Sequence, residues 1–213
     1  MKAVEYIAKK VSHYNRERKW KLFLDTFNMG ENTKILDIGF SDNEYKDSDN
    51  WIEKHYPHLE NLTALGVDEP VLFRTRYPKV KVVRYAGREF PFFDKEFDIC
   101  WTNAVIEHVG TRADQLLYLK EIKRTGKAAF ITTPNKLFPI EVHTRVPFLH
   151  WLPKNLFDRF LKMIGKDWAA GDYMNLLTLK DLKALLQEAE IEDYKIYKNK
   201  ILGLTMDFVI IIN

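Results

Sequence analysis

The chain has 213 residues, of which 46% are hydrophobic, and its formal net charge is +3. This length and composition suit one large globular domain. No apolar run approaches the roughly 18 residues that a membrane span needs. Charges interrupt the N-terminal segment, so we expect no secretory signal. Because Cys100 is the only cysteine, a disulfide framework and a thiolate metal site are excluded, and we expect a reducing, cytoplasmic compartment.

Positive charge is concentrated in two segments. Residues 1–21 hold seven Lys or Arg against two acids, and residues 136–166 hold six against two. Two solvated helical faces would explain this, and so would a basic rim around a site for an anionic or lipid-linked partner. Nucleic acid is not expected as a partner, because no recognised binding motif accompanies the charge.

The predicted elements begin with a helical segment over about residues 1–30, where Trp20, Phe23, Leu24 and Phe27 recur at helical spacing. From residue 34 onward, short apolar runs alternate with helical segments. This alternation is typical of a parallel sheet that is covered by helices on both faces. The five expected strands are 34–39, 62–68, 80–85, 97–102 and 127–132.

Two helices are predicted from their capping residues. Thr111 and Asp114 form a capping-box-like start, and Gly126 suits the end of that helix. A second helix is expected to begin at Thr178, with Asp181 three residues further on.

Two more strand-like runs, 191–197 and 204–212, close the chain. Only a few residues join them, including Asn199 and Gly203, and such a short link permits antiparallel pairing but no parallel crossover. We therefore predict an α/β, Rossmann-like, doubly wound sheet of seven strands. It should be mainly parallel, with one antiparallel C-terminal strand.

The longest connection spans residues 134–177, and insertions of this length are usually functional. Aromatic and basic residues are frequent in it. We expect a single domain over 1–213, in which 1–30 is an N-terminal helical cap and 134–177 is a lid-like insertion.

Two strand ends carry nucleotide-site signals. Asp37 and Gly39 end the first strand, and ligands of such sheets bind beyond the carboxyl ends of the strands. A glycine there lets the backbone approach a ligand closely. Asp68 ends the second strand, where a carboxylate can accept hydrogen bonds from both hydroxyls of a ribose.

The third signal is the stretch FDICWTNAVIEHV at residues 97–109. It resembles the type 11-like branch of the class I S-adenosylmethionine-dependent methyltransferases, and Phe97, Asp98, Glu107 and His108 are among its matching residues. The resemblance covers roughly residues 34–135. It implies that the protein is a methyltransferase whose methyl donor is S-adenosylmethionine.

The resemblance also implies a role for individual positions. Asp37, Gly39 and Ser41 would line the methionine end of the donor, and Asp68 would hold its ribose. Glu107 and His108 would lie near the floor of the site. Gly87 would offer backbone groups to the adenine. Asn103 and Ala104 would contact the amino acid end of the donor.

Two positions depart from the family pattern. The glycine-rich loop reads Gly-Phe-Ser-Asp-Asn at 39–43, so only its first glycine is present. Ala86 stands where relatives often carry an acid that contacts the adenine.

Methyl transfer mainly requires alignment and exclusion of water, and a hydroxyl or acidic carbon acceptor also benefits from a base with a pKa near neutral. We expect His108 and His143 as the catalytic candidates. A structural role for either histidine explains the sequence equally well. Glu141, His143 and His150 match no defined metal-site spacing, so no metal is expected.

Arg145, Trp151 and Tyr173 are the expected substrate-binding residues of the insertion. We predict a small-molecule, glycan or lipid-linked acceptor. Peripheral contact with a membrane is one further possibility, and the sequence predicts no oligomeric state. A catalytically silent relative that acts as a binding module is one alternative. An NAD-binding oxidoreductase is another, although it would require a full Gly-x-Gly-x-x-Gly.

Overall fold

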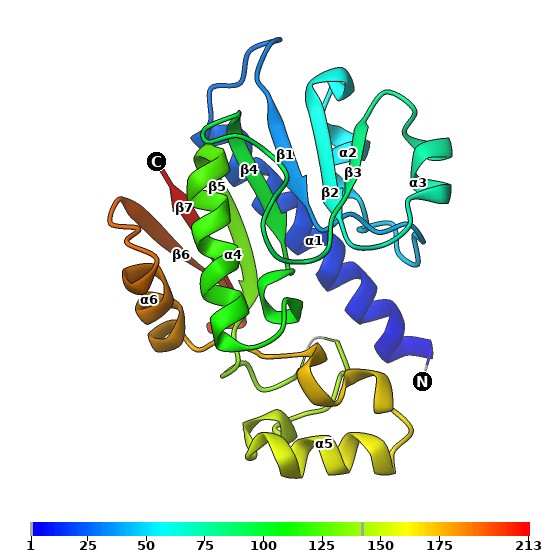
Figure 1. Cartoon of the computed structure of the whole chain (residues 1–213). Helices are drawn as coiled ribbons and strands as arrows, with labels where there is room; N and C mark the ends of the chain where they lie inside the picture. Colours follow the sequence, from blue (N-terminus) through cyan, green and yellow to red (C-terminus); the bar gives the residue numbers. More distant parts are fainter. Residues whose placement is uncertain (1, 142) are drawn as a thin grey trace.

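The computed structural model describes residues 2–141 and 143–213. Its described residues form one seven-stranded sheet with the order β3-β2-β1-β4-β5-β7-β6 (Figure 1). Strands β1 to β5 pair with one another in parallel, as the alternating apolar runs predicted. The strands are β1 Ile35–Ile38, β2 Leu62–Gly66, β3 Lys81–Arg84, β4 Phe97–Asn103, β5 Gly126–Pro134, β6 Tyr194–Ile201 and β7 Leu204–Ile212.

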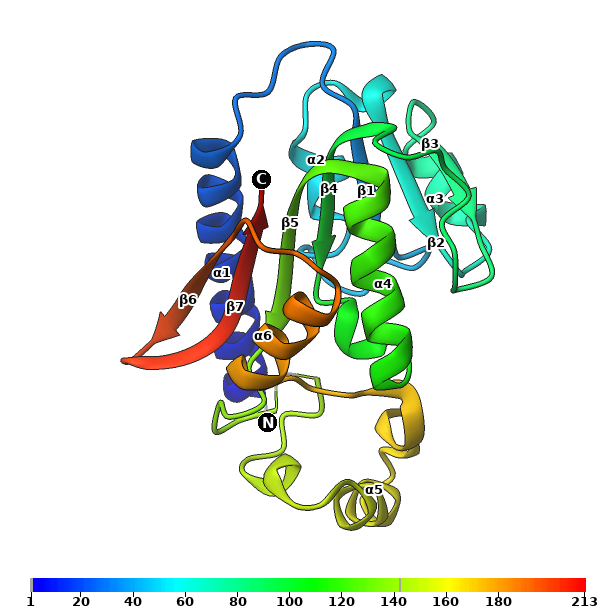
Figure 2. The ribbon, with the colours of Figure 1, turned by 60° about the vertical axis from the view of Figure 1, so that its left-hand side comes forward.

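Helices cover both faces of this sheet (Figures 1 and 2). One core cluster joins α4 and α6 to residues such as Leu36 and Ile131, and the other joins α1, α2 and α3 to Ile35 and Phe130. Both faces are buried, which explains why the strands read as continuous apolar runs. The helices are α1 Lys2–Thr26, α2 Trp51–His55, α3 Val71–Arg76, α4 Arg112–Thr125, α5 Lys154–Met163 and α6 Leu179–Glu188, with 3-10 turns η1 Leu59–Asn61, η2 Ile106–His108, η3 Leu149–Trp151, η4 Asp167–Ala169 and η5 Gly171–Tyr173.

The C-terminal hairpin confirms the predicted antiparallel strand. β7 pairs antiparallel with both β5 and β6. The prediction placed β6 too early, at 191–197, whereas the strand runs from Tyr194 to Ile201. Ile191 looked like a strand residue because it is apolar, but it is buried in the turn after α6. The hairpin link is shorter than expected, because Asn199 lies within β6.

The capping predictions are confirmed. Thr111 and Asp114 form a capping box at the start of α4, and Gly126 is the C-cap of that helix. Thr178 and Asp181 form a second capping box at the start of α6. These reciprocal hydrogen bonds satisfy backbone N–H groups that have no partner within the helix.

An aromatic cluster fixes α1 to the sheet. Phe23 is fully buried and lies edge-on to Trp101 and Phe130, at ring-centroid distances of 4.8 and 5.4 Å. Trp20 stacks on Phe23 at 5.3 Å. Leu24 was expected on this apolar face, but it is 47% exposed because it points away from the sheet. The helix is thus held by its second half.

Residues 134–177 lie beyond the carboxyl ends of the parallel strands, around α5 (Figure 1). They have a small core of their own, which includes Val146, Phe157 and Leu161. None of the helices in the described ranges is long and apolar enough to cross a membrane.

Replacing Phe23 by Ala should lower the free energy of unfolding by about 3 to 5 kcal/mol, because it opens a cavity under α1. Leu24→Ala, one residue further along the same helix, should lower it by less than about 1 kcal/mol. Urea denaturation of the two variants measures both effects. Equal losses would contradict the anchoring role of Phe23.

Candidate active site

The ends of β1, β2 and β4 meet at the carboxyl edge of the sheet. Gly39 has a φ of +102°, and a Cβ atom built on it would lie 2.4 Å from Val105 Cγ2. Only glycine fits this close approach between the β1 loop and the residues after β4. Gly87, whose φ is +83°, faces Val67 across the ends of β2 and β3. These contacts place the expected donor residues along one edge.

The loop after β1 is ordered without the two missing glycines. The Ser41 backbone N–H donates to Asn50 Oδ1 at 2.8 Å, and the Ser41 hydroxyl donates to the Asn43 carbonyl at 2.7 Å. Phe40 fills the space beside Gly66, where a Cβ atom would lie only 2.5 Å from its ring. The departure from the family pattern therefore still yields a defined loop.

A buried pair of carboxyl groups lies under this loop. Asp37 and Glu53, from β1 and α2, are 6% and 3% exposed. Burial raises the pKa of Asp37 to about 7, although the neighbouring Glu53 side chain and the charge of Arg16 act to lower it. Burial and the charge of Asp37 raise the pKa of Glu53 well above its usual range. Neither Glu53 side-chain oxygen has a hydrogen-bond partner within the described residues, so ionising this group would leave a buried charge without compensation.

Helix α1 brings cations to the same edge. The buried Lys19 ammonium donates to Asn103 Oδ1 at 3.1 Å and lies 3.8 Å from Asp207 Oδ2. Burial lowers the pKa of Lys19, and the charge of Asp207 opposes this shift. Burial also lowers the pKa of Arg16, against the charges of acids that include Asp37. The start of the chain thus supplies positive charge to the site.

Asn103 and Ala104 end β4 beside these cations. Asn103 Oδ1 also accepts a hydrogen bond from the Thr132 hydroxyl at 2.5 Å, whereas its buried Nδ2 has no partner among the described residues. Ala104 adopts a left-handed φ of +59°. A buried amide donor without a partner is unusual in a folded protein, and it is available to a ligand.

Asp68 is exposed just after β2. Its charge affects Tyr173 of the insertion. Burial raises the pKa of Tyr173, and the charges of Asp68 and Glu107 raise it further. Tyr173 therefore lies within electrostatic range of both acids.

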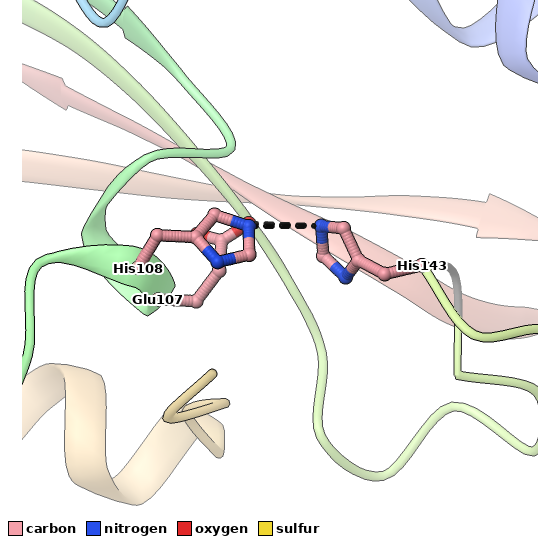
Figure 3. Close-up of side chains that lie close together, drawn as sticks. All are labelled: Glu107, His108 and His143. Carbon is pink, nitrogen blue, oxygen red and sulfur yellow. Dashed lines mark hydrogen bonds and ion pairs between the residues drawn. The ribbon is translucent and has the colours of Figure 1, made fainter. Parts of the chain in front are cut away.

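Glu107, His108 and His143 form a cluster at this edge, which we call the histidine cluster (Figure 3). Their side chains come from η2 and from the insertion. The two Nε2 atoms face one another at 3.1 Å. Glu107 Oε1 lies 4.0 Å from the His108 Nε2 atom and 3.8 Å from that of His143. Thr133 donates to the other oxygen, Glu107 Oε2, at 3.0 Å.

Each imidazole is held by its other nitrogen. His143 Nδ1 lies 2.8 Å from Glu141 Oε1, and His108 Nδ1 lies 2.8 Å from the Tyr173 carbonyl. Burial acts to raise the pKa of Glu141, but hydrogen bonds from His143 and Thr144 and the charge of His143 lower it to about 2. Burial acts to lower the pKa of His143, yet Glu141 and Glu107 raise it overall.

The other residues expected in the insertion lie at different distances from the cluster. Arg145 is exposed and belongs to the same turn as His143, since its backbone N–H donates to the Glu141 carbonyl at 2.7 Å. Tyr173 contacts the His108 ring at 4.8 Å. Trp151 instead contacts Phe148, at 5.2 Å. The structure therefore brings Arg145 and Tyr173 to the cluster and places Trp151 in a separate aromatic group.

Sequence reasoning missed several residues of this edge. Lys19 and Arg16 were seen only as part of a basic segment, and nothing in the sequence indicated which of its cations turn inward. Glu53 carried no signal, because a single acid in a short helix is ordinary. Glu141 was considered only as a metal ligand, whereas it orients His143.

Comparison with known proteins agrees with this geometry. A family model described as a methyltransferase domain matches residues 49–129, which include α2 and the whole of β4. No curated protein sequence matches the chain.

Solved structures share the fold. A SAM-dependent methyltransferase from Methanosarcina mazei is 18% identical, with 86% of this chain and 92% of that chain covered and a TM-score of 0.53. One from Aquifex aeolicus is 16% identical, with 90% and 87% covered and a TM-score of 0.52. Phosphoethanolamine N-methyltransferase 2 of Haemonchus contortus is 11% identical, with 85% of this chain but only 38% of that chain covered and a TM-score of 0.57.

The buried pair predicts a pH-dependent stability. The folded protein keeps protons on Asp37 and Glu53 that the unfolded chain releases near pH 4. Raising the pH from 4 towards 8 therefore lowers the free energy of unfolding through this pair. Glu53→Gln keeps a hydrogen-bond donor but has no proton to lose. It should be more stable than the native chain at pH 8, by about 1.4 kcal/mol for each unit by which the pKa of Glu53 is raised.

Urea denaturation at pH 4, 6 and 8 measures this difference, which should vanish at pH 4. The exposed Glu192→Gln is the control and should show no such trend. A Glu53→Gln variant that is less stable than the native chain at pH 8 would contradict the raised pKa of Glu53.

Proposed function

We propose an acceptor class for this protein, which is a class I S-adenosylmethionine-dependent methyltransferase with a type 11-like domain. It transfers the methyl group to a small-molecule, glycan or lipid-linked acceptor that combines an apolar body with a negative charge. One observation supports this proposal: the histidine cluster joins η2, at the carboxyl edge of the sheet, to the aromatic and basic insertion that contributes His143 and Tyr173.

The residues of the donor edge fit S-adenosylmethionine. When bound, this donor supplies a methyl carbon that is activated by a sulfonium leaving group. Asp37 offers a buried carboxylate to its ammonium group, while Lys19 and the unpartnered Nδ2 of Asn103 suit its carboxylate. The close approach at Gly39 leaves the loop backbone accessible. We assign the ribose to Asp68.

The same proposal gives backbone roles to three further positions. The Ser41 loop and Ala104 border the methionine end, and the positive φ of Gly87 leaves backbone groups available to the adenine. Since Ala86 brings no acid, recognition of the adenine depends on these groups.

The acceptor end of the proposal rests on His108 and His143. A hydroxyl or acidic carbon must lose a proton as it is methylated, and a base held in hydrogen-bond reach removes it most effectively. The cluster is the part of the donor edge that combines imidazoles with a buried carboxylate. We therefore assign proton removal at the acceptor to the histidine cluster.

The insertion supplies the acceptor surface in this proposal. Trp151 and Tyr173 are about half exposed and can cover an apolar body. Arg145 presents a planar guanidinium in the turn that holds His143, and it can pair with a carboxylate or phosphate in two parallel hydrogen bonds. We treat 134–177 as a cover within one domain and α1 as a cap. A cytoplasmic location agrees with the buried thiol of Cys100.

Asp68→Ala should weaken the binding of S-adenosylmethionine by at least about tenfold, because it removes both acceptor oxygens from the ribose. The matched control is Glu69→Ala, an exposed acid that pairs with Arg84 instead. Isothermal titration with S-adenosylmethionine measures both. Unchanged affinity in Asp68→Ala would remove the ribose assignment.

Arg145→Ala should leave donor affinity unchanged and lower the turnover of anionic acceptors, with little change for neutral analogues. Formation of S-adenosylhomocysteine is measured over a panel of anionic and neutral amphiphilic acceptors, at low and high salt, because screening should weaken the pairing. Arg159→Ala, an exposed arginine on α5, is the control. Weaker donor binding in Arg145→Ala with unchanged acceptor kinetics would contradict the acceptor proposal.

A further inference from the structure

The two imidazoles of the histidine cluster need positive charge between them. The Tyr173 carbonyl can only accept, so His108 Nδ1 donates to it. The Glu141 carboxylate likewise accepts from His143 Nδ1. If both rings are neutral, each has its only proton on Nδ1, and two lone pairs face each other at an Nε2–Nε2 distance of 3.1 Å. This arrangement is repulsive unless a proton or a cation lies between the rings.

The third side of the cluster also lacks a partner. Glu107 is fully buried, and its Oε1 atom accepts no hydrogen bond from the described residues. A buried carboxylate oxygen normally has a donor or a cation as its partner. This oxygen is close to both Nε2 atoms, at 3.8 and 4.0 Å, and it faces the same space.

The distances suit a metal ion. The point in the plane of the three atoms that is equidistant from them lies about 2.1 Å from each, which is the length of zinc–imidazole and zinc–carboxylate bonds. A small approach of Glu107 to the two rings would move the ion out of this plane and give it a tetrahedral position. Two histidines and one glutamate form the ligand set of catalytic zinc sites, which keep a fourth position open.

The surrounding hydrogen bonds are those of a metal centre as well. A metal-bound histidine usually donates its other N–H to a carboxylate or a backbone carbonyl, which fixes the ring and its tautomer. Glu141 does this for His143 and the Tyr173 carbonyl does it for His108. Thr133 orients Glu107 through its second oxygen.

We propose that Glu107 Oε1, His108 Nε2 and His143 Nε2 bind one divalent cation of the zinc type. This site differs from the combination of Glu141, His143 and His150 that sequence spacing argued against. His150 is not a member of the cluster: its Nε2 atom lies 2.9 Å from the Phe138 carbonyl, and its Nδ1 atom has no partner among the described residues. With both Nε2 atoms on the cation, neither imidazole is free to act as the base. The open position would instead take the acceptor oxygen, whose proton is lost to water more easily on a cation. This last role rests on the proposed function, but the binding site does not.

Metal titration of the full-length protein tests the site without donor or acceptor. After treatment with a chelator, the protein is titrated with Co²⁺, followed by its visible absorption, and with Zn²⁺ by calorimetry. We expect one equivalent of each, with Zn²⁺ displacing Co²⁺. His143→Ala and Glu107→Gln should weaken binding at least about a hundredfold, and Glu141→Gln roughly 10- to 100-fold. His58→Ala, outside the cluster, should bind as the native chain does.

Circular dichroism and titration with S-adenosylmethionine establish that each variant is folded, and Glu141→Gln keeps the test open should a ligand variant unfold. A native protein that takes up neither ion would overturn the proposal. Uptake that His143→Ala and Glu107→Gln leave unchanged would overturn it as well, and a proton would then be what lies between the rings. A protein that binds Zn²⁺ here but methylates nothing would refute the proposed function alone.

Discussion

The burial of carboxyl groups at the carboxyl edge of the sheet is the constraint on which the rest of the structure depends. Asp37, Glu107 and Asp207 are each at most 6% exposed and lie at the ends of neighbouring elements. Ionised carboxylates are costly to bury unless cations or donors compensate them. The protein meets this demand from both sides, with Lys19 on α1 and His143 on the insertion. Elements that are remote in the sequence are thus drawn to one place.

This constraint explains why the ends of the molecule are arranged as they are. Phe23 fixes α1 to the sheet by apolar packing. One turn earlier in the same helix, Lys19 reaches the polar edge of the sheet. The apolar residues of this helix therefore pack against the sheet, and its basic residues supply positive charge to the buried acids. On the opposite side, Glu141 bonds the backbone and side chains of His143 and Thr144 and so shapes the turn that presents the imidazole.

The fold could be predicted from local sequence patterns, because the residues that form a strand or cap a helix are close together in the sequence. Thr111 and Thr178 marked their helices correctly, and the short link before β7 gave its direction. The start of β6 was misplaced, since a buried apolar residue such as Ile191 looks the same in a turn as in a strand. The position of Asp37 near the end of β1 was predictable from the apolar run that precedes it. The contact of His108 with His143 was not, because 35 residues and an irregular insertion separate them.

The two halves of the histidine cluster are held by different means, and this gives the group between them a structural role. The η2 half is tied to the end of the insertion by hydrogen bonds to the main chain. The Asn175 N–H donates to the Glu107 carbonyl at 2.7 Å, and the Gln115 side-chain Nε2 donates to the Ile106 and Asn175 carbonyls. The His143 half is a turn that is organised mainly by its own Glu141. The contact between the imidazoles joins the two halves. Whatever carries the positive charge there, therefore, also closes the start of the insertion against its end.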